Sequence, residues 1–261
     1  MPETHRMLER ALDILELAGQ YENGLSLSEI CNMLDMPKSS VHSLVHTLCK
    51  RKYLAYDKER QKYSIGVKTF EMGSRFLSSS GLRKEIIDAI NKLAEECGET
   101  VHFGILDDGD VIYLHKCESK QQIRMASSVG KRLPAYSTAI GKALLSGLKD
   151  EEIKKLYPQN NFKKLTVNTI NDINILLKQI NEARLSGFAY EIEESTEGIR
   201  CVSAPIKNAD NIVVAAISIA VPVYRANQEF INKLAAMVMD YAAVLSKLIG
   251  NRGLSVKDVF S

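Results

Sequence analysis

The sequence is poor in cysteine, has no long apolar run and carries almost no net charge, and each shortage excludes a class of protein. Its five cysteines are scattered without a C-x-x-C pair, which argues against a disulfide framework and for reduced thiols in a cytoplasm. No apolar run approaches the ~18 residues that cross a bilayer, and the opening MPETHRMLER contains no apolar segment of a secretory signal. A net charge of +2 excludes a uniformly basic nucleic-acid binder but permits a local basic face. We therefore expect a cytoplasmic protein with no membrane partner.

The chain has enough apolar material to build a sizeable core. Its 261 residues are 45% hydrophobic and 25% charged, as in an ordinary soluble protein. At a typical size of ~150 residues for a domain, this length allows one large domain or two small ones.

The charges of the first 62 residues are separated along the chain. Residues 1–35 carry two arginines and seven acidic residues, a net −5, whereas residues 36–62 carry seven lysines or arginines and two acidic residues, a net +5. A solvated basic face is the ordinary explanation of such a run. The local pattern of elements favours a surface that binds nucleic acid instead.

Three helices followed by a hairpin are predicted in this segment. Apolar side chains recur at helical spacing over residues 7–18, and Ser26 with Glu29 has the spacing of a capping box at the start of a second, short helix. Pro37 suits the first turn of a third helix, and residues 53–65 alternate as two short strands around a charged turn. This order predicts a winged helix-turn-helix.

The predicted third helix has an apolar inward face and a polar outward face. Small hydroxyl groups, imidazoles and lysines suit close contact with phosphates and base edges in a major groove. We therefore predict DNA contacts from the outward side chains Lys38, Ser39, Ser40, His42, Ser43 and His46. The charged turn of the hairpin should reach phosphate through Lys58, Arg60 and Lys62.

Six segments, in this order, resemble the IclR family of bacterial transcriptional regulators: ERALDILELAG, LSLSEICNMLDMPKSSVHSLVHTLCKRKYLAYD, YSIGVKTFEMG, VHFGILDDGDVIYLHKCES, RMASSVGKRLPAYSTAIGKALL and GFAYEIEESTEGIRCVSAPI. The resemblance covers nearly the whole chain. It implies a ligand-responsive transcription regulator, a repressor, with double-stranded DNA and a small-molecule effector as partners and with no cofactor. A palindromic operator bound by a homodimer or homotetramer is expected, because a two-fold DNA site mirrors two-fold protein symmetry.

Three positions depart from the usual family pattern. Ser43 and His46 stand where the family commonly has arginine, so bidentate contacts to guanine or phosphate cannot be carried over to them. Lys52 stands where the family usually has glycine, so we expect a lysine with positive φ just after the third helix. These departures affect the operator sequence but not the fold.

Domain boundaries are placed at 1–65 for the winged helix-turn-helix, 66–80 for a helix that ends near a triple serine, and 81–261 for an effector-binding domain. The resemblance implies that 66–80 is a linker helix that also helps the DNA-binding domains to dimerise.

The last domain mixes helices with strands, so the fold class is α+β. The resemblance implies a sheet with a ligand cavity on one side, similar to GAF and PAS sensor domains. The expected helices are 83–97, 138–147, 150–156, 169–185 and 227–249, and the expected strands are 101–106, 111–115, 123–126, 187–190, 201–207 and 212–220.

An effector site is expected where a helix starts near Ala139. Backbone N–H groups at a helix start attract a carboxylate, although a capped helix without a ligand would have the same sequence. A cysteine in an apolar strand, such as Cys201, is more often a core residue, but by resemblance Cys201 and Glu191 correspond to pocket-lining positions. Because Glu191 would repel an effector's acid, that acid should point toward residues 138–141.

The residues predicted to bind the effector are Met125, Tyr136, Ser137, Ala139, Ile140, Glu191, Cys201 and Ser203. Core packing is an equal alternative for Met125 and Tyr136. Glu193, Glu194 and Glu197 are expected to be solvated loop charges.

Two other classes of function fit parts of the sequence. An enzyme could use Cys201 as a nucleophile with His102 or His115 as its base, although no G-x-S-x-G, H-E-x-x-H or dinucleotide fingerprint is present. A sensor module that binds protein rather than DNA is the other alternative. Neither needs the charge separation of the first 62 residues, so we expect no catalytic residue.

Two groups of side chains have a composition that suits a metal. His42 and His46 are four residues apart on one helix, with Cys49 near them, and His102 or His115 could join Cys201 or Glu191 if the fold gathers them. Without paired ligands elsewhere, no metal site is expected.

Overall fold

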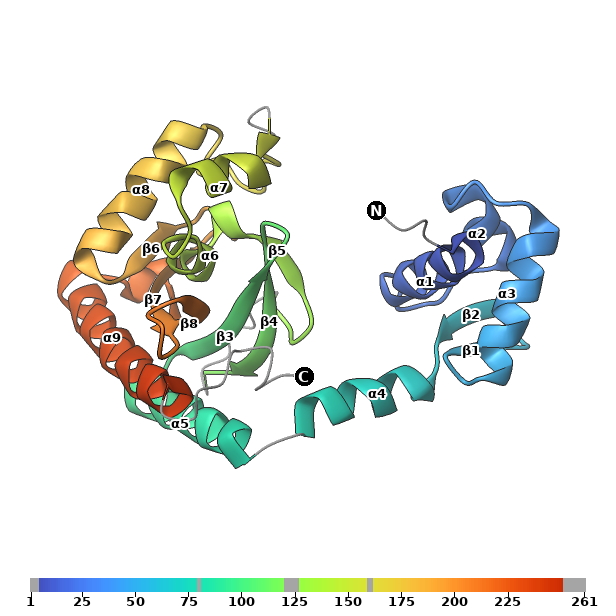
Figure 1. Cartoon of the computed structure of the whole chain (residues 1–261), viewed down its shortest axis with the longest axis horizontal. Helices are drawn as coiled ribbons and strands as arrows, with labels where there is room; N and C mark the ends of the chain where they lie inside the picture. Colours follow the sequence, from blue (N-terminus) through green and yellow to red (C-terminus); the bar gives the residue numbers. More distant parts are fainter. Residues whose placement is uncertain (1–4, 79–80, 120–126, 159–161, 251–261) are drawn as a thin grey trace. The chain divides into compact units, whose positions relative to one another are not determined.

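The computed structural model describes residues 5–78, 81–119, 127–158 and 162–250. The chain divides into two compact units, with the division at residues 79–80 (Figure 1). The strand expected at 123–126, and with it Met125, lies outside the described residues.

The first unit packs three helices and a hairpin around one core, and a further helix follows the hairpin (Figure 1). Its elements are α1 (Arg6–Gly19), α2 (Leu27–Met33), α3 (Lys38–Lys50), β1 (Leu54–Asp57), β2 (Lys62–Ile65) and α4 (Val67–Ser78). Ile14, Ile30 and Val41 are fully buried at its centre. The predicted winged helix-turn-helix is confirmed.

Local sequence explains where the chain turns in this unit. Ser26 Oγ accepts the N–H of Glu29 at 3.3 Å, and Glu29 Oε2 accepts the N–H of Ser26 at 2.7 Å, so the capping box is confirmed. Lys52 has a φ of 62°, as expected for this lysine. Gly66 passes so close to the Lys52 carbonyl oxygen that a Cβ would overlap it. Only glycine therefore fits where the hairpin leads into α4.

The second unit is built on a six-stranded sheet in which every strand pair is antiparallel, in the order β5-β4-β3-β8-β7-β6. The strands are β3 (Thr100–Asp107), β4 (Asp110–Cys117), β5 (Arg132–Pro134), β6 (Ala189–Ile192), β7 (Ile199–Lys207) and β8 (Val213–Pro222). The helices are α5 (Gly81–Cys97), α6 (Ala139–Leu145), α7 (Asp150–Leu156), α8 (Ile173–Ser186) and α9 (Gln228–Gly250), with short 3-10 turns at Ala135–Ser137 and Val223–Arg225. The α+β class is confirmed.

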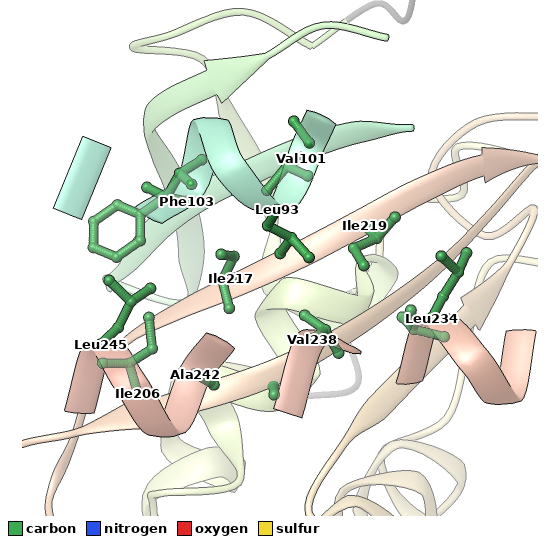
Figure 2. Close-up of a cluster of buried hydrophobic side chains, with 14 of the residues drawn as sticks. Leu93, Val101, Phe103, Ile206, Ile217, Ile219, Leu234, Val238, Ala242 and Leu245 are labelled. Carbon is green, nitrogen blue, oxygen red and sulfur yellow. The ribbon is translucent and has the colours of Figure 1, made fainter. Parts of the chain in front are cut away.

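The two faces of this sheet carry different side chains. On one face, large apolar residues such as Ile217 and Ile219 of β8 pack against Val238 of α9 and Leu93 of α5 (Figure 2). Because side chains alternate along a strand, the opposite face receives the intervening residues, and these include Cys201 of β7 and Ser218 of β8. Their small size leaves space between the sheet and α6.

Two local features differ from the sequence-based expectation. The helix expected from residue 169 begins at Ile173, because Asp172 Oδ1 caps it by accepting the N–H of Asn174 at 2.7 Å. Thr169 instead donates its hydroxyl to the Glu194 carbonyl at 2.7 Å. Strand β5 was not predicted, since three residues are too few to show alternation.

Among the described residues, no helix is both long and apolar enough to cross a membrane.

Candidate DNA-binding surface and ligand cavity

Helix α3 presents one polar face to solvent. Val41, Val45 and Leu48 anchor its other face in the core of the first unit. Of the side chains predicted to contact DNA, Ser40 is half-buried and the remainder are exposed: Lys38, Ser39, His42, Ser43 and His46. An exposed helix with a polar face has the shape that a major groove admits.

The hairpin turn between β1 and β2 is shaped by one acidic side chain. Asp57 Oδ1 accepts the N–H groups of Glu59 at 2.9 Å and Arg60 at 3.1 Å, which holds the turn closed. Lys58 and Arg60 project from it and are exposed, whereas Lys62 lies opposite Asp57 in the strand register and is half-buried. The wing therefore presents its cations at the tip and along one strand.

The second unit contains a cavity of about 170 Å³. This is roughly ten times the space that one water molecule needs, so the cavity can hold a small organic molecule. Its lining consists of His102, Tyr113, Ser127, Lys131, Leu133, Thr138, Ala139, Ile140, Leu165, Glu191, Ser195, Thr196, Ile199, Cys201, Ser218 and Ala220. Hydroxyl groups and a few ionisable side chains are thus mixed with apolar walls, as in many ligand pockets.

Four of the residues predicted to bind an effector line this cavity: Ala139, Ile140, Glu191 and Cys201. The first two belong to the first turn of α6, which Thr138 caps by accepting the N–H of Gly141 on its side-chain oxygen at 3.0 Å. The first backbone N–H groups of a helix have no acceptor within it. The helix start and the β6–β7 segment therefore face the same cavity from different elements.

Three other predicted residues are buried but are not part of the cavity lining. Tyr136 packs edge-on against Phe162 with 4.8 Å between ring centroids, in agreement with the core-packing alternative for this residue. Ser137 Oγ donates to the Pro134 carbonyl at 2.9 Å, and Ser203 Oγ donates to the Ile217 carbonyl at 2.8 Å. These hydroxyl groups satisfy backbone acceptors behind the cavity wall.

His102 and Tyr113 bring ionisable groups into the cavity that were not predicted as effector-binding residues. Burial, with a further contribution from the Lys116 charge, lowers the pKa of His102 to about 3, so its ring is neutral. His102 Nε2 lies 2.7 Å from Ser127 Oγ. Burial raises the pKa of Tyr113 far above its usual range, so its hydroxyl is also neutral. Their placement depends on strand pairing, which no short motif reports.

Glu191 and Cys201 form a cross-strand pair between β6 and β7. Glu191 is 1% exposed, and its Oε2 accepts the N–H of Glu194 at 2.8 Å. Burial raises the pKa of Glu191 to about 7, against the opposing effects of hydrogen bonds from Glu194 and the Cys201 thiol. Burial, with the Glu191 charge, raises the pKa of Cys201 well above its usual value. The thiol is therefore neutral, which argues against a cysteine nucleophile.

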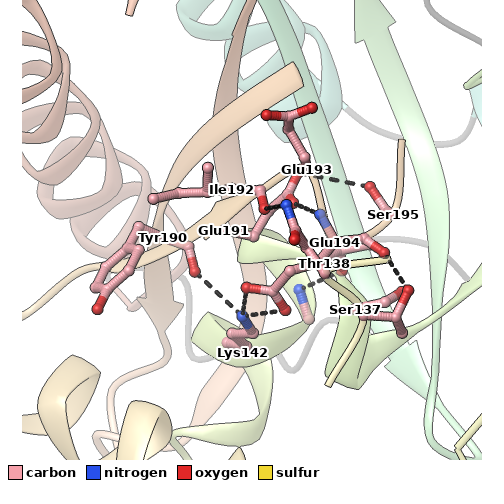
Figure 3. Close-up of polar contacts among 12 residues, drawn as sticks. Ser137, Thr138, Lys142, Tyr190, Glu191, Ile192, Glu193, Glu194 and Ser195 are labelled. Atoms are coloured by element: carbon pink, nitrogen blue, oxygen red, sulfur yellow. Dashed lines mark hydrogen bonds and ion pairs between the residues drawn. The ribbon is translucent and has the colours of Figure 1, made fainter. Parts of the chain in front are cut away.

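Lys142 and Glu194 form a buried ion pair beside this cavity (Figure 3). Lys142 Nζ lies 2.6 Å and 2.7 Å from the two carboxylate oxygens of Glu194, and the residues are 1% and 5% exposed. The expectation that Glu194 is a solvated loop charge is therefore wrong, because the loop after β6 folds inward against α6. Glu197 is exposed, as expected, and Glu193 is half-buried, with its carboxylate accepting the N–H of Gly198 at 2.9 Å.

The histidines that could serve a metal do not gather suitable partners. His115 lies 3.4 Å from Asn91 of α5 and is not part of the cavity lining, whereas His102 shares the cavity with Glu191 and Cys201. Among the described residues, no group of three or more histidine, cysteine or acidic side chains has an arrangement that could hold a metal ion.

A winged helix-turn-helix unit combined with an α+β unit that encloses a cavity is the architecture of a transcription regulator with a sensor domain. Two family descriptions match the chain: the IclR helix-turn-helix domain over residues 4–58 and the bacterial transcriptional regulator IclR C-terminal over residues 74–247. The chain belongs to the IclR family of bacterial transcriptional regulators.

Similar proteins agree with this assignment. The HTH-type transcriptional regulator KdgR of Escherichia coli (strain K12) is 32% identical over 249 residues, which are 95% of this chain and 94% of KdgR. The structure of an IclR transcriptional regulator from Alicyclobacillus acidocaldarius has a TM-score of 0.84 at 23% identity, covering 95% of this chain and 100% of that one. An IclR homolog from Microbacterium hydrocarbonoxydans complexed with 4-hydroxybenzoate has a TM-score of 0.77 at 18% identity, covering 93% of this chain and 98% of that one.

Proposed function

We propose that this chain is a cytoplasmic transcriptional repressor whose DNA binding is controlled by a small carboxylate effector. Residues 1–65 bind the operator, residues 66–80 form a linker helix, and residues 81–261 bind the effector. The observation that carries the proposal is the exposed polar face of α3 beside a basic wing, in a member of a transcription regulator family.

A palindromic operator is bound by a dimer or a dimer of dimers, because the symmetry of the site matches that of the protein. Helix α4 supports this assembly. Its Val67 and Phe70 side chains are 57% and 73% exposed, and exposed apolar side chains of this size favour burial against another copy.

In this proposal, α3 reads base edges in the major groove, and Lys58, Arg60 and Lys62 of the wing neutralise phosphates. Phosphate contacts contribute affinity without sequence preference. Lys62→Ala should therefore weaken binding to all DNA sequences alike and flatten the salt dependence by about one unit of slope. Fluorescence anisotropy with operator and random DNA, over a series of salt concentrations, measures both quantities.

Lys178→Ala is the matched control for this experiment. Lys178 is exposed on α8 of the second unit, so its loss changes the net charge equally without touching the proposed DNA surface. If Lys62→Ala and Lys178→Ala have the same affinity and salt slope as the native chain, the wing does not contact phosphate.

The effector lies in the cavity between the start of α6 and the β6–β7 segment. Its carboxylate points to the N–H groups of Ala139 and Ile140, where the helix dipole is positive. Its hydroxyl or oxo oxygen points toward Glu191 and Cys201. The cavity volume of about 170 Å³ supports a short hydroxy- or oxo-carboxylate. The fold neighbour complexed with 4-hydroxybenzoate holds a molecule of the same broad class.

The effector can be found by a thermal-shift screen of small carboxylates, followed by operator binding with and without each hit. Ala139→Asp places a negative charge at the helix start and should abolish the response to the hit while operator binding is kept. Ala139→Asn adds the same volume without the charge and is the matched control. A normal response in Ala139→Asp would move the carboxylate site away from α6.

A further inference from the structure

The polar groups beside the cavity are unequal in charge. Glu191 of β6 and Glu194 in the loop after it are both buried carboxyl groups, and Lys142 of α6 is a buried cation beside them (Figure 3). Burying an unpaired charge is costly, so a buried carboxyl group without a cation favours its neutral form. The protonation of each carboxyl group therefore depends on whether it is paired with Lys142.

Hydrogen-bond geometry assigns Lys142 to Glu194. An ammonium group has three donors. In Lys142 they are directed to the two carboxylate oxygens of Glu194, at 2.6 Å and 2.7 Å, and to the Tyr190 carbonyl oxygen at 3.4 Å. Lys142 therefore has no donor left for Glu191 and acts on it only through space.

Among the described residues, the other groups that hydrogen-bond to Glu191 are uncharged. Its oxygens accept the N–H of Glu194 at 2.8 Å and the hydroxyl of Ser195 at 3.5 Å, and the Cys201 thiol is a weak donor. Tyr113 is neutral, and the nearby Glu194 carboxylate opposes a second negative charge.

Two further groups line the cavity from other elements. His102 of β3 has a neutral ring. Lys131, which precedes β5, is a cation that also lines the cavity. Among the described residues, the hydrogen bonds of Lys142 thus go to Glu194 and to the Tyr190 carbonyl oxygen rather than to Glu191.

On the effector site proposed above, we infer that Glu191 meets the effector as a neutral carboxylic acid and donates a hydrogen bond to one of the effector's oxygens. Lys142 and Glu194 are positioning residues in this arrangement, because their pairing keeps Glu191 without a cation. The effector oxygen that faces Glu191 is then an acceptor, and a negatively charged oxygen is tolerated there. When such an anion binds, Glu191 keeps its proton.

Infrared difference spectroscopy on the ligand-free protein tests the protonation directly. The difference spectrum of the native chain minus Glu191→Gln should contain the carbonyl band of a protonated carboxyl group at about pH 6. Most of this band should be absent at about pH 8, because burial raises the pKa of Glu191 to about 7. Glu194→Gln releases Lys142 to pair with Glu191, so the band should be absent at both pH values. Absence of the band from the native chain at pH 6 overturns the inference.

Calorimetric titration with pyruvate and with lactate tests the consequence for binding. The Kd of the native chain should rise about tenfold between pH 6 and pH 8, because the protonated fraction of Glu191 falls by that factor. Glu191→Gln donates from its amide at both pH values, so its Kd should not change. A native Kd that is constant or lower at pH 8 overturns the inference.

The two experiments separate this inference from the proposed function. If neither pyruvate nor lactate binds the native chain at either pH, these two acids are rejected as effectors, while the infrared band still decides whether Glu191 is neutral. Peptides from β7 and β8 should stay protected from hydrogen exchange in Glu191→Gln, which shows that the second unit of this variant is folded.

Discussion

The buried ion pair between Lys142 and Glu194 allows a sharp prediction about stability. Lys142→Met removes the ammonium group and keeps a side chain of similar length. Glu194 is then left in the fold without its cation, next to Glu191, which already lacks one. Removing one partner of a buried pair costs about 3–5 kcal/mol, because the remaining charge is desolvated and uncompensated. We expect a loss in this range near pH 7.

Two further variants of this ion pair should be more stable than Lys142→Met. Glu194→Gln should cost less than Lys142→Met, because Lys142 can still be compensated by Glu191. The double variant Lys142→Met with Glu194→Gln should recover most of the loss, since a neutral pair is often as stable as a buried ionic one. The loss in Lys142→Met should also shrink as the pH falls, because burial raises the pKa of Glu194 and protonation removes the unpaired charge.

Hydrogen exchange in increasing urea measures this effect, because peptides from β7 and β8 report the second unit separately from the first. Arg132→Met is the matched control. Arg132 also lies 2.7 Å from a carboxylate, that of Asp107, but the two side chains are 44% and 52% exposed. Exposed pairs contribute at most about 1 kcal/mol. Equal losses in Lys142→Met and Arg132→Met would refute the argument that burial sets the cost.

Three further predictions concern single side chains. Ser26→Ala should destabilise the first unit by about 1 kcal/mol through loss of the capping box, as measured by hydrogen exchange of α2. Cys201→Ser should keep the fold and the operator affinity but weaken effector binding by roughly 1 kcal/mol in calorimetry. As the pH rises from about 4.5 to 7, the free energy of unfolding of the native chain should fall by up to roughly 3 kcal/mol relative to that of Glu191→Gln. The reason is that the Glu191 carboxyl group loses its proton at lower pH in the unfolded chain than in the folded one. A difference in unfolding free energy that does not change with pH would contradict this last prediction.

The fold of the first unit could be predicted from the sequence because its signals are local. The capping box at Ser26, the apolar spacing of α3 and the charged turn at Asp57 each act within a few residues. The start of α8 was misplaced by four residues, although Asp172, the side chain that caps it, is a local signal. Thr169, which was expected in the helix, instead hydrogen-bonds to the Glu194 carbonyl, more than twenty positions away. No local pattern reports a partner at that distance.

The cavity was predicted only in part, for the same physical reason. Ala139, Ile140, Glu191 and Cys201 were found through the helix start and the family resemblance, and they do line the cavity. His102 and Tyr113 reach it through the pairing of β3 with β4 and β8. The burial of Glu194 depends on how the loop after β6 folds, so a run of acidic residues in the sequence looks like a solvated loop.

The Gly141-Lys142 pair shows how one short segment serves packing and electrostatics together. A Cβ at Gly141 would overlap the backbone of Ala135, so glycine allows α6 to approach the turn that precedes it. That approach buries the next residue, Lys142, which is 1% exposed and reaches Glu194. The lysine in turn holds the loop that carries Ser195 and Thr196 into the cavity lining. Gly141 and Lys142 thus position this wall of the cavity together, and substituting Gly141 would displace the wall without removing a side chain that contacts a ligand.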